Sequence, residues 1–157
     1  MRNLKPLVFL TLSFCYYFSA AQTKIQQKLP EKTRILFVLD GSGSMNALWS
    51  GEQSRMDIAK QILTRLVDSL RVNADLELGL RVYGHRFSRQ ANNCEDSKLE
   101  VPFAPKNHNA IISKIKDIIP KGTTPITYSV LQAAKDFPVN PGYRNILILI
   151  TDGIESC

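Results

Sequence analysis

Two apolar segments, far apart in the sequence, each run into an aspartate that is followed by glycine. Residues 35–39 (ILFVL) precede Asp40-Gly41, and residues 146–151 (ILILIT) precede Asp152-Gly153. Continuous apolar runs of this length are typical of strands that are buried on both faces of a parallel sheet. Open α/β sheets hold their ligands beyond the carboxyl ends of such strands. Asp40 and Asp152 are therefore candidate residues of one site.

The loop after the first strand adds further oxygen atoms. Asp40, Ser42 and Ser44 alternate with glycines, so a tight extended loop can bring their side chains to one point. A carboxylate with two hydroxyl groups suits a hard cation such as Mg²⁺, which takes six oxygen ligands, better than it suits zinc. The alternative is an ordinary flexible turn, because Gly, Ser and Asp are also common turn residues.

These residues resemble the metal-ion-dependent adhesion site of a von Willebrand factor A domain. The resemblance consists of Asp-x-Ser-x-Ser after the first strand, Gly-x-Thr in a central loop and an Asp after a later strand, and it covers residues 34–157. It implies that Asp40, Ser42 and Ser44 bind the metal directly. It implies that Asp152 is a further ligand, in many relatives through water. The expected ion is Mg²⁺, with Mn²⁺ and Ca²⁺ as alternatives.

The central loop offers two candidate threonines in the run Gly122-Thr123-Thr124-Pro125. Thr124 fits the Gly-x-Thr position better than Thr123, because Gly122 stands two residues before it. A threonine before a proline can also cap the helix that follows, with the proline in its first turn. Thr124 is therefore the expected fifth metal-site residue, and helix capping is a second role open to it.

The first residues have the composition of a secretory signal peptide. Residues 1–5 are basic, residues 7–18 are almost wholly apolar, and small residues precede an expected cut after Ala21. The apolar run is too short for a membrane span. We expect a signal peptide at 1–21, a polar tether at 22–33 and one domain at 34–157. Export to the periplasm, the cell surface or the medium follows, with no stable membrane span after cleavage.

Charge and cysteine content narrow the functions further. Without Arg2 and Lys5 the formal net charge falls from +6 to +4, and no basic stripe is interleaved with aromatic residues, so nucleic-acid binding has little support. The arginines at 81, 86 and 89 are interpreted as a solvated positive face. Two cysteines, Cys94 and Cys157, remain after the signal peptide. They can bridge each other in an oxidising compartment, or Cys157 can pair with a partner further along a longer chain.

The order of elements predicts an open, mostly parallel α/β sheet with helices on both faces. We expect strands at 34–39, 75–83, 99–101 and 144–151, of which the short third strand is an antiparallel edge ended by proline. Helical periodicity predicts helices at 54–71, 109–119 and 125–137. Domains of the family continue beyond this point, so a missing C-terminal part is expected, which would leave residues 146–150 on an exposed edge.

Three classes of function are compatible with this pattern. The first is a non-enzymatic binding module in which the metal takes a carboxylate from an Asp or Glu of a partner protein. The second is a structural protein in which the metal only fastens loops. The third is a metal-dependent phosphatase, which also places an Asp after a strand but needs a second acid, where this chain has Ser42, and a charge partner near Asp152. His85, with no second His or Cys at metal spacing, is expected at the surface or at a strand end.

Overall fold

Strand β1 lies inside a four-stranded sheet with the order β5-β4-β1-β6. The structure is a computed structural model that describes residues 32–157, so the expected signal peptide and residues 22–31 of the tether lie outside the described part. The strands are β1 (Lys32–Asp40), β4 (Leu76–Tyr83), β5 (Ser97–Pro105) and β6 (Tyr143–Ile150). Strand β1 runs parallel to both β4 and β6, and β5 is antiparallel to β4. The expected open, mostly parallel sheet with one antiparallel edge is therefore confirmed.

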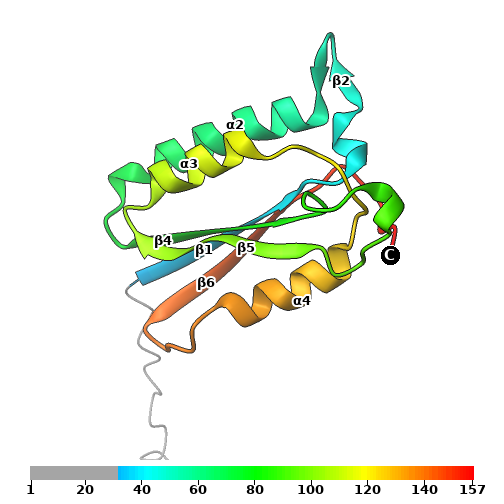
Figure 1. Cartoon of the computed structure of the whole chain (residues 1–157). Coiled ribbons are helices and arrows are strands. Elements are labelled where there is room, and N and C mark those ends of the chain that lie inside the picture. Colours follow the sequence, from blue (N-terminus) through cyan, green and yellow to red (C-terminus); the bar gives the residue numbers. More distant parts are fainter. Residues whose placement is uncertain (1–31) are drawn as a thin grey trace, which may run out of the picture.

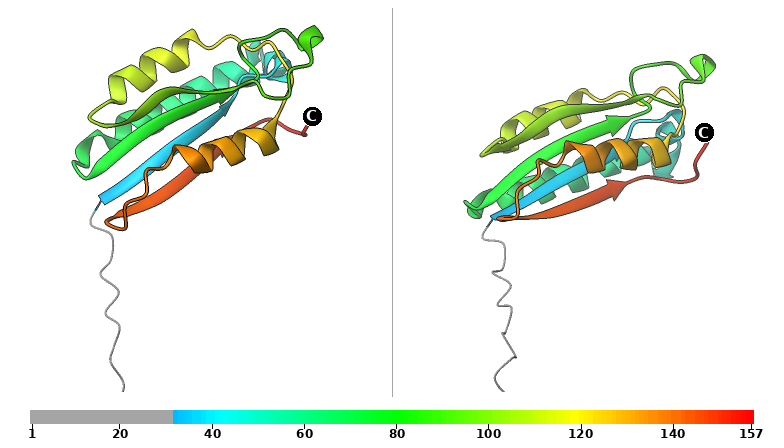
Figure 2. Two further views of the ribbon diagram at one scale, coloured as in Figure 1. Left: turned by 60° about the horizontal axis from the view of Figure 1, so that its bottom comes forward. Right: turned by 90° about the horizontal axis from the view of Figure 1, so that it is seen from below.

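Three helices cover the two faces of this sheet (Figure 1). Helices α2 (Arg55–Ser69) and α3 (His108–Asp117) lie on one face, and α4 (Ile126–Asp136) lies on the other, as the two turned views also show (Figure 2). The alternation of side chains along β1 explains this division. Phe37 and Leu39 pack in the core under α2 and α3, whereas Leu36 and Val38 pack in the core with α4. All four side chains are fully buried.

Helix α2 starts where its sequence predicts. Ser54 is the N-cap of α2, and its side chain accepts a hydrogen bond from the backbone N–H of Asp57, whose own side chain accepts from the Ser54 backbone. This reciprocal capping satisfies N–H groups that the first helical turn cannot pair. Between β1 and α2 lie the short helix η1 (Gly43–Asn46) and a small hairpin of β2 (Leu48–Ser50) and β3 (Gln53–Ser54). Two further 3-10 turns are η2 (Leu70–Val72) and η3 (Arg89–Ala91).

Several element bounds differ from the sequence-based expectation by a few residues. Strand β1 begins at Lys32 rather than Arg34. Strand β5 does not end at Pro102 but continues to Pro105, because Pro102 falls in an irregularity of the ladder on an edge strand, where a missing N–H is tolerated. Helix α3 ends at Asp117 rather than at Ile119, which lies beyond the helix and is exposed.

Strand β6 forms the other edge of the described sheet. It pairs with β1, and no other described strand lies on its outer side. Its apolar residues 146–150 are only partly covered, and Leu149 is exposed. The expectation of an apolar edge at 146–150 is thus met. Within residues 32–157 no helix has the length and apolar content that crossing a bilayer would take.

Candidate metal centre

The two aspartates lie at neighbouring strand ends. The register of β1 against β6 places Leu39 opposite Ile150. Asp40, at the end of β1, and Asp152, two residues after β6, therefore lie at the same carboxyl end of two adjacent parallel strands. The loops that begin at these two points meet there (Figure 1). The sequence prediction that both residues belong to one place in the fold is consistent with this arrangement.

Asp40 is completely buried, and its carboxylate is held by neutral donors. Its Oδ1 accepts from the Ser42 backbone N–H at 2.8 Å, and its Oδ2 accepts from the Thr151 hydroxyl at 2.9 Å. No Lys or Arg of residues 32–157 forms an ion pair with it. A buried carboxylate without a counter-charge is costly unless it binds a cation. The surroundings of Asp40 therefore fit a metal ligand.

The phenol of Tyr83 lies beside this carboxylate. Its hydroxyl is buried near Asp40 and Thr151 but makes no hydrogen bond of good geometry. Burial, and then the negative charge of Asp40, raise the pKa of Tyr83 far above its usual value. The tyrosine consequently stays protonated and adds no negative charge to the site.

A series of hydrogen bonds joins the two aspartates through Ser42, whose backbone N–H donates to Asp40, and through Ser44. The hydroxyls of Ser42 and Ser44 lie 2.9 Å apart, and the Ser44 hydroxyl donates to Asp152 Oδ1 at 3.0 Å. The other oxygen of Asp152 is paired with the guanidinium of Arg55, at the start of α2. Ser42 is buried and Ser44 is exposed, so this series of hydrogen bonds runs from the core to the surface. The sequence did not point to Arg55 as a partner of Asp152.

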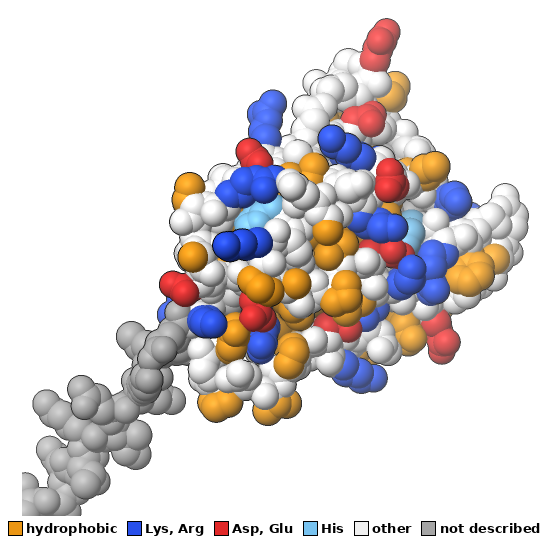
Figure 3. Space-filling view, turned by 60° about the vertical axis from the view of Figure 1, so that its left-hand side comes forward, with side chains coloured by type: hydrophobic (Ala, Val, Ile, Leu, Met, Phe, Trp, Pro, Cys, Tyr) orange, Lys and Arg blue, Asp and Glu red, His pale blue; other side chains and the backbone are white. Residues whose placement is uncertain are grey.

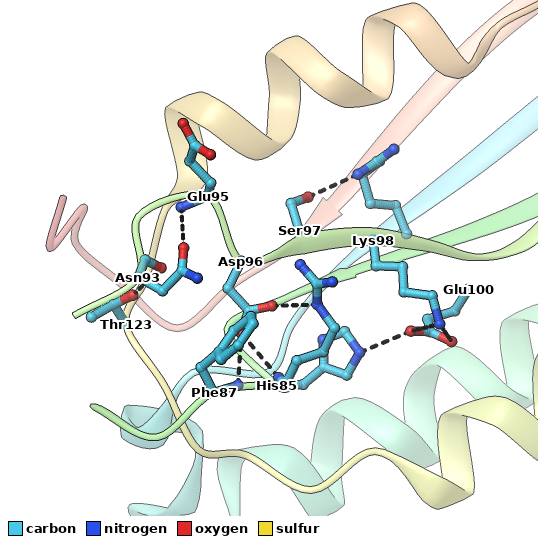
Figure 4. Close-up of polar contacts among 11 residues, drawn as sticks. His85, Phe87, Asn93, Glu95, Asp96, Ser97, Lys98, Glu100 and Thr123 are labelled. Carbon is cyan, nitrogen blue, oxygen red and sulfur yellow. Dashed lines mark hydrogen bonds and ion pairs between the residues drawn. The ribbon is translucent and has the colours of Figure 1, made fainter. Parts of the chain in front are cut away.

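The two threonines of the central loop differ in their contacts. The hydroxyl of Thr123 donates to the backbone carbonyl of Asn93 at 2.9 Å (Figure 4). No hydrogen bond of the Thr124 hydroxyl is found among residues 32–157, whereas its backbone is fixed on both sides by Ser156: Thr124 N–H donates to Ser156 Oγ at 2.7 Å, and Ser156 N–H donates to Thr124 O at 3.2 Å. These contacts leave the Thr124 hydroxyl unused, and the metal-binding role that the Gly-x-Thr spacing predicts for it stays a prediction.

Backbone contacts between glycines hold three loops together at this point. Gly43 N–H donates to Gly122 O at 2.9 Å, and Gly122 N–H donates to Gly84 O at 2.7 Å. Gly84 has a φ of +67°, and a Cβ on it would lie 2.3 Å from the Thr123 carbonyl oxygen. Only glycine fits so close an approach. The loops that carry Ser42 and Thr124 therefore have a fixed relative position.

The loop between β4 and β5 is anchored by a buried aspartate. Asp96 accepts hydrogen bonds from the backbone N–H groups of Arg86 and Phe87 and pairs with the Arg86 side chain at 2.7 Å (Figure 4). A disulfide joins Cys94 of this loop to Cys157, with Cα atoms 5.6 Å apart. Of the two pairings that the sequence left open, the structure contains the bridge within the chain.

Segment 151–157 is fixed by this bridge to the loop between β4 and β5 and, separately, by Glu155 to the start of α4. Both carboxylate oxygens of Glu155 accept from the first N–H groups of that helix, at Ile126 and Thr127. Burial raises the pKa of Glu155, but these backbone hydrogen bonds lower it more, so the net pKa is below its usual value. A carboxylate in this position also complements the positive helix end.

His85 and Glu100 form a polar cluster next to the site. His85 Nε2 lies 3.0 Å from Glu100, which also receives Lys98 at 3.1 Å and Lys114 at 3.3 Å (Figure 4). His85 lies two residues after the end of β4, so the expected strand-end position is met, but its side chain is only 10% exposed and does not lie on the surface. Burial lowers the pKa of His85 despite the nearby carboxylate. His85 is consequently neutral at pH 7 and donates to Glu100 through Nε2.

A pocket of about 360 Å³ opens beside the site. It is lined by Ser44, Thr124 and Asp152 together with Arg55, Arg89, Gly122, Thr123, Gly153, Ile154 and Ser156. Within residues 32–157 no group of three His, Cys, Asp or Glu side chains is arranged to hold a metal. The donor set here has another character: two carboxylates and three hydroxyls, the hard oxygen ligands that Mg²⁺ prefers. The residues present fit that ion and do not fit zinc.

The sequence belongs to a recognised family. The profile of the von Willebrand factor type A domain matches residues 35–155, which include both aspartates and both loops described above. The chain is therefore a member of the von Willebrand factor type A domain family. No curated protein matches it in sequence.

Solved structures share the fold at low sequence identity. BatB, a conserved hypothetical protein of Bacteroides thetaiotaomicron, is similar with a TM-score of 0.58 and 22% identity, over 74% of this chain and 52% of BatB. The von Willebrand domain of the type V pili tip protein Mfa5 from Porphyromonas gingivalis gives 0.59 and 18%, over 79% and 38%. The pilus adhesin SpaC of Lactobacillus rhamnosus GG gives 0.62 and 18%, over 80% and 15%. The chain spans about half of BatB and less of the other two.

Proposed function

We propose that this chain is an exported binding module that holds a divalent cation, Mg²⁺ before Mn²⁺ or Ca²⁺, and uses it to capture a carboxylate of a partner protein. Asp40, Ser42, Ser44, Thr124 and Asp152 would hold the ion. The single observation that supports this most is the buried Asp40 carboxylate, which is bonded only by neutral donors beside two hydroxyls. A bound divalent cation supplies a Lewis-acidic position that favours an anionic oxygen ligand.

The protein residues have separate tasks in this proposal. Asp40 supplies the buried negative charge, and Thr151 orients it. Ser44 links the ion site to Asp152, whose second oxygen is neutralised by Arg55. With that charge partly compensated, the protein donors leave a divalent ion short of negative charge, and an outside carboxylate of an Asp or Glu can supply it.

Adhesion is the role that the relatives suggest. Mfa5 is a pili tip protein and SpaC is a pilus adhesin, and we propose a comparable interaction role here. Export is supported by the signal-peptide composition of residues 1–21 and by a disulfide, which persists in oxidising compartments. A nucleic-acid partner has little support, and on the face in Figure 3 the Lys and Arg side chains are interspersed with Asp and Glu.

Two alternatives remain distinguishable. In a structural protein the cation would only fasten the loops. In a phosphatase-like enzyme, Arg55 could serve as the charge partner of Asp152, but position 42 still carries a serine in place of a second acid. A non-enzymatic module is therefore the better proposal.

Calorimetric titration of Mg²⁺ and Mn²⁺ into the chain tests it. Wild type should bind one ion, and Asp40→Asn should lose that binding, because the buried charge is removed. Asp68→Asn, at an exposed position on α2, is the matched control and should bind normally. Adding acetate or an acidic peptide should raise the metal affinity if the ion takes an outside carboxylate, and should not change it in a purely structural site. Undiminished metal uptake by Asp40→Asn would refute the proposal.

A further inference from the structure

Two arginines line the pocket beside the proposed ion site from different elements. Arg55 comes from the first turn of α2, and Arg89 comes from η3 in the loop between β4 and β5. Asp152 is the single acidic residue that lines the pocket, and apart from it and the two arginines the lining residues are uncharged. The sequence placed Arg89 in a solvated basic face. Its side chain is exposed, as expected, and it also lines a pocket that it shares with Ser44 and Asp152.

The two guanidinium groups differ in how far they are already neutralised. Arg55 pairs with Asp152, and its side chain is 34% exposed. Its Nε is buried without a hydrogen-bond partner. Arg89 is exposed, and its side chain forms no ion pair or hydrogen bond with any residue of the described range 32–157. Arg89 is thus the cation of this pocket that is open to a ligand.

The charge balance then calls for more than one anionic group. Asp40 and Asp152 together carry two negative charges, whereas one divalent cation, Arg55 and Arg89 together carry four positive charges, so two positive charges are left over. One carboxylate at the ion would leave one of these charges uncompensated. A guanidinium group binds a carboxylate through two parallel N–H donors. A second carboxylate at Arg89 would complete the balance.

We infer that the pocket recognises a pair of neighbouring acidic side chains on a protein partner, one at the ion and one at Arg89. This inference rests on the proposed function, since it adds a second contact to the same site. The pocket volume of about 360 Å³ lies in the range of small-ligand sites. Ile154, 88% exposed, also lines the pocket. An apolar contact of this kind suits a polypeptide better than a bare inorganic anion.

The loop that carries Arg89 is anchored by contacts that leave the Arg89 side chain free to bind. Its loop is tied to segment 151–157 by the Cys94–Cys157 disulfide and to β4 and β5 by the buried Asp96. A cation on an anchored loop loses less conformational freedom on binding than one on a free loop. The arginine therefore acts as a specificity residue.

Peptide binding in Mg²⁺ to the whole chain tests this inference. The probes are two capped peptides that differ in one group, Gly-Asp-Asp-Gly and Gly-Asp-Asn-Gly, and a third, Gly-Asp-phosphoserine-Gly. Wild type should prefer the diacid over the amide by about tenfold. In Arg89→Ala that preference should vanish while the amide peptide still binds. Arg144→Ala, an exposed arginine at the opposite end of the sheet with the same change in charge, should keep the wild-type preference.

The possible results separate this inference from the proposed function. Equal binding of diacid and amide by wild type, or an unchanged preference in Arg89→Ala, overturns the acidic pair but leaves the ion site intact. A preference for the phosphopeptide over the diacid also overturns it, because the second group would then be a phosphate. Failure of all three peptides to bind in Mg²⁺ removes both proposals. Arg89→Lys, which keeps the charge without the planar fork, should retain part of the preference.

Discussion

Thr123 and Thr124 are adjacent in the chain, but only Thr123 has its hydroxyl bonded within the described protein. We predict that Thr124→Val weakens Mg²⁺ binding about tenfold with little change in stability. Thr123→Val should instead lower the free energy of unfolding by about 1 kcal/mol, because Asn93 O loses its donor. Calorimetry and chemical denaturation of both variants separate the two effects. If Thr123→Val caused the larger loss of metal affinity, the assignment of Thr124 would be wrong.

Single residues could be predicted from the sequence where the motif and the strand ends coincide. Asp40 and Asp152 follow apolar strands, and the structure puts these strands side by side. Thr151 and Arg55 could not be assigned in this way, because their roles depend on contacts with residues about a hundred positions away. Arg89 carried no signal beyond its charge. Pairing across such distances depends on the packed fold and leaves no local pattern.

At the scale of loops and strands, the closest approach in the site is made by Gly84. We predict that Gly84→Ala costs about 3 kcal/mol of stability or more, since a methyl group there meets the Thr123 carbonyl oxygen at a positive φ. Gly51→Ala is the matched control. Gly51 also has a positive φ, of +58°, but a Cβ would meet nothing within 4 Å, so about 1 kcal/mol is expected. If Gly84→Ala and Gly51→Ala lost the same amount of stability in thermal or chemical unfolding, the close contact of Gly84 with the Thr123 loop would be contradicted.

The polar cluster of His85, Lys98, Glu100 and Lys114 predicts how the stability of the protein depends on acidic pH. Burial would raise the pKa of Glu100, but Lys98, His85 and Lys114 outweigh it and lower this pKa to about 2. A carboxylate with a lowered folded-state pKa contributes stability above its unfolded pKa of 4.5, and this is lost as the pH falls towards 2. Glu100→Gln should therefore flatten the stability profile between these pH values. The profile of exposed Glu52→Gln should follow wild type, and a parallel profile for Glu100→Gln would contradict the prediction.

Elements were predictable where periodicity decides them. The capping box at Ser54 and the buried run of β1 are local signals, and both elements form close to the expected positions, with β1 beginning two residues early at Lys32. Strand β5 was predicted too short because the irregular pairing that accommodates Pro102 is set by its neighbour β4. The burial of His85 depends in the same way on Glu100, fifteen residues away.

For the whole molecule, the bridge between Cys94 and Cys157 is the strongest long-range constraint. It closes a loop with a sequence separation of 63 residues, for which the loss of unfolded-state entropy corresponds to about 4 kcal/mol. We predict that Cys94→Ser or reduction with dithiothreitol lowers the unfolding temperature and also weakens Mg²⁺ binding, because Ser156 holds the Thr124 backbone. The reductant should have no further effect on Cys94→Ser. Unchanged metal affinity after reduction would show that segment 151–157 stays in place without the bridge.

The central position of β1 has a consequence for when the proposed metal site can form during folding. Leu39 and Ile150 are paired although they are more than a hundred positions apart, so the two halves of the proposed metal site come together only when the first and the last of the described strands have paired. Contacts of such long range form slowly during folding. If the proposed metal site is correct, binding of the cation therefore requires that β1 and β6 have already paired.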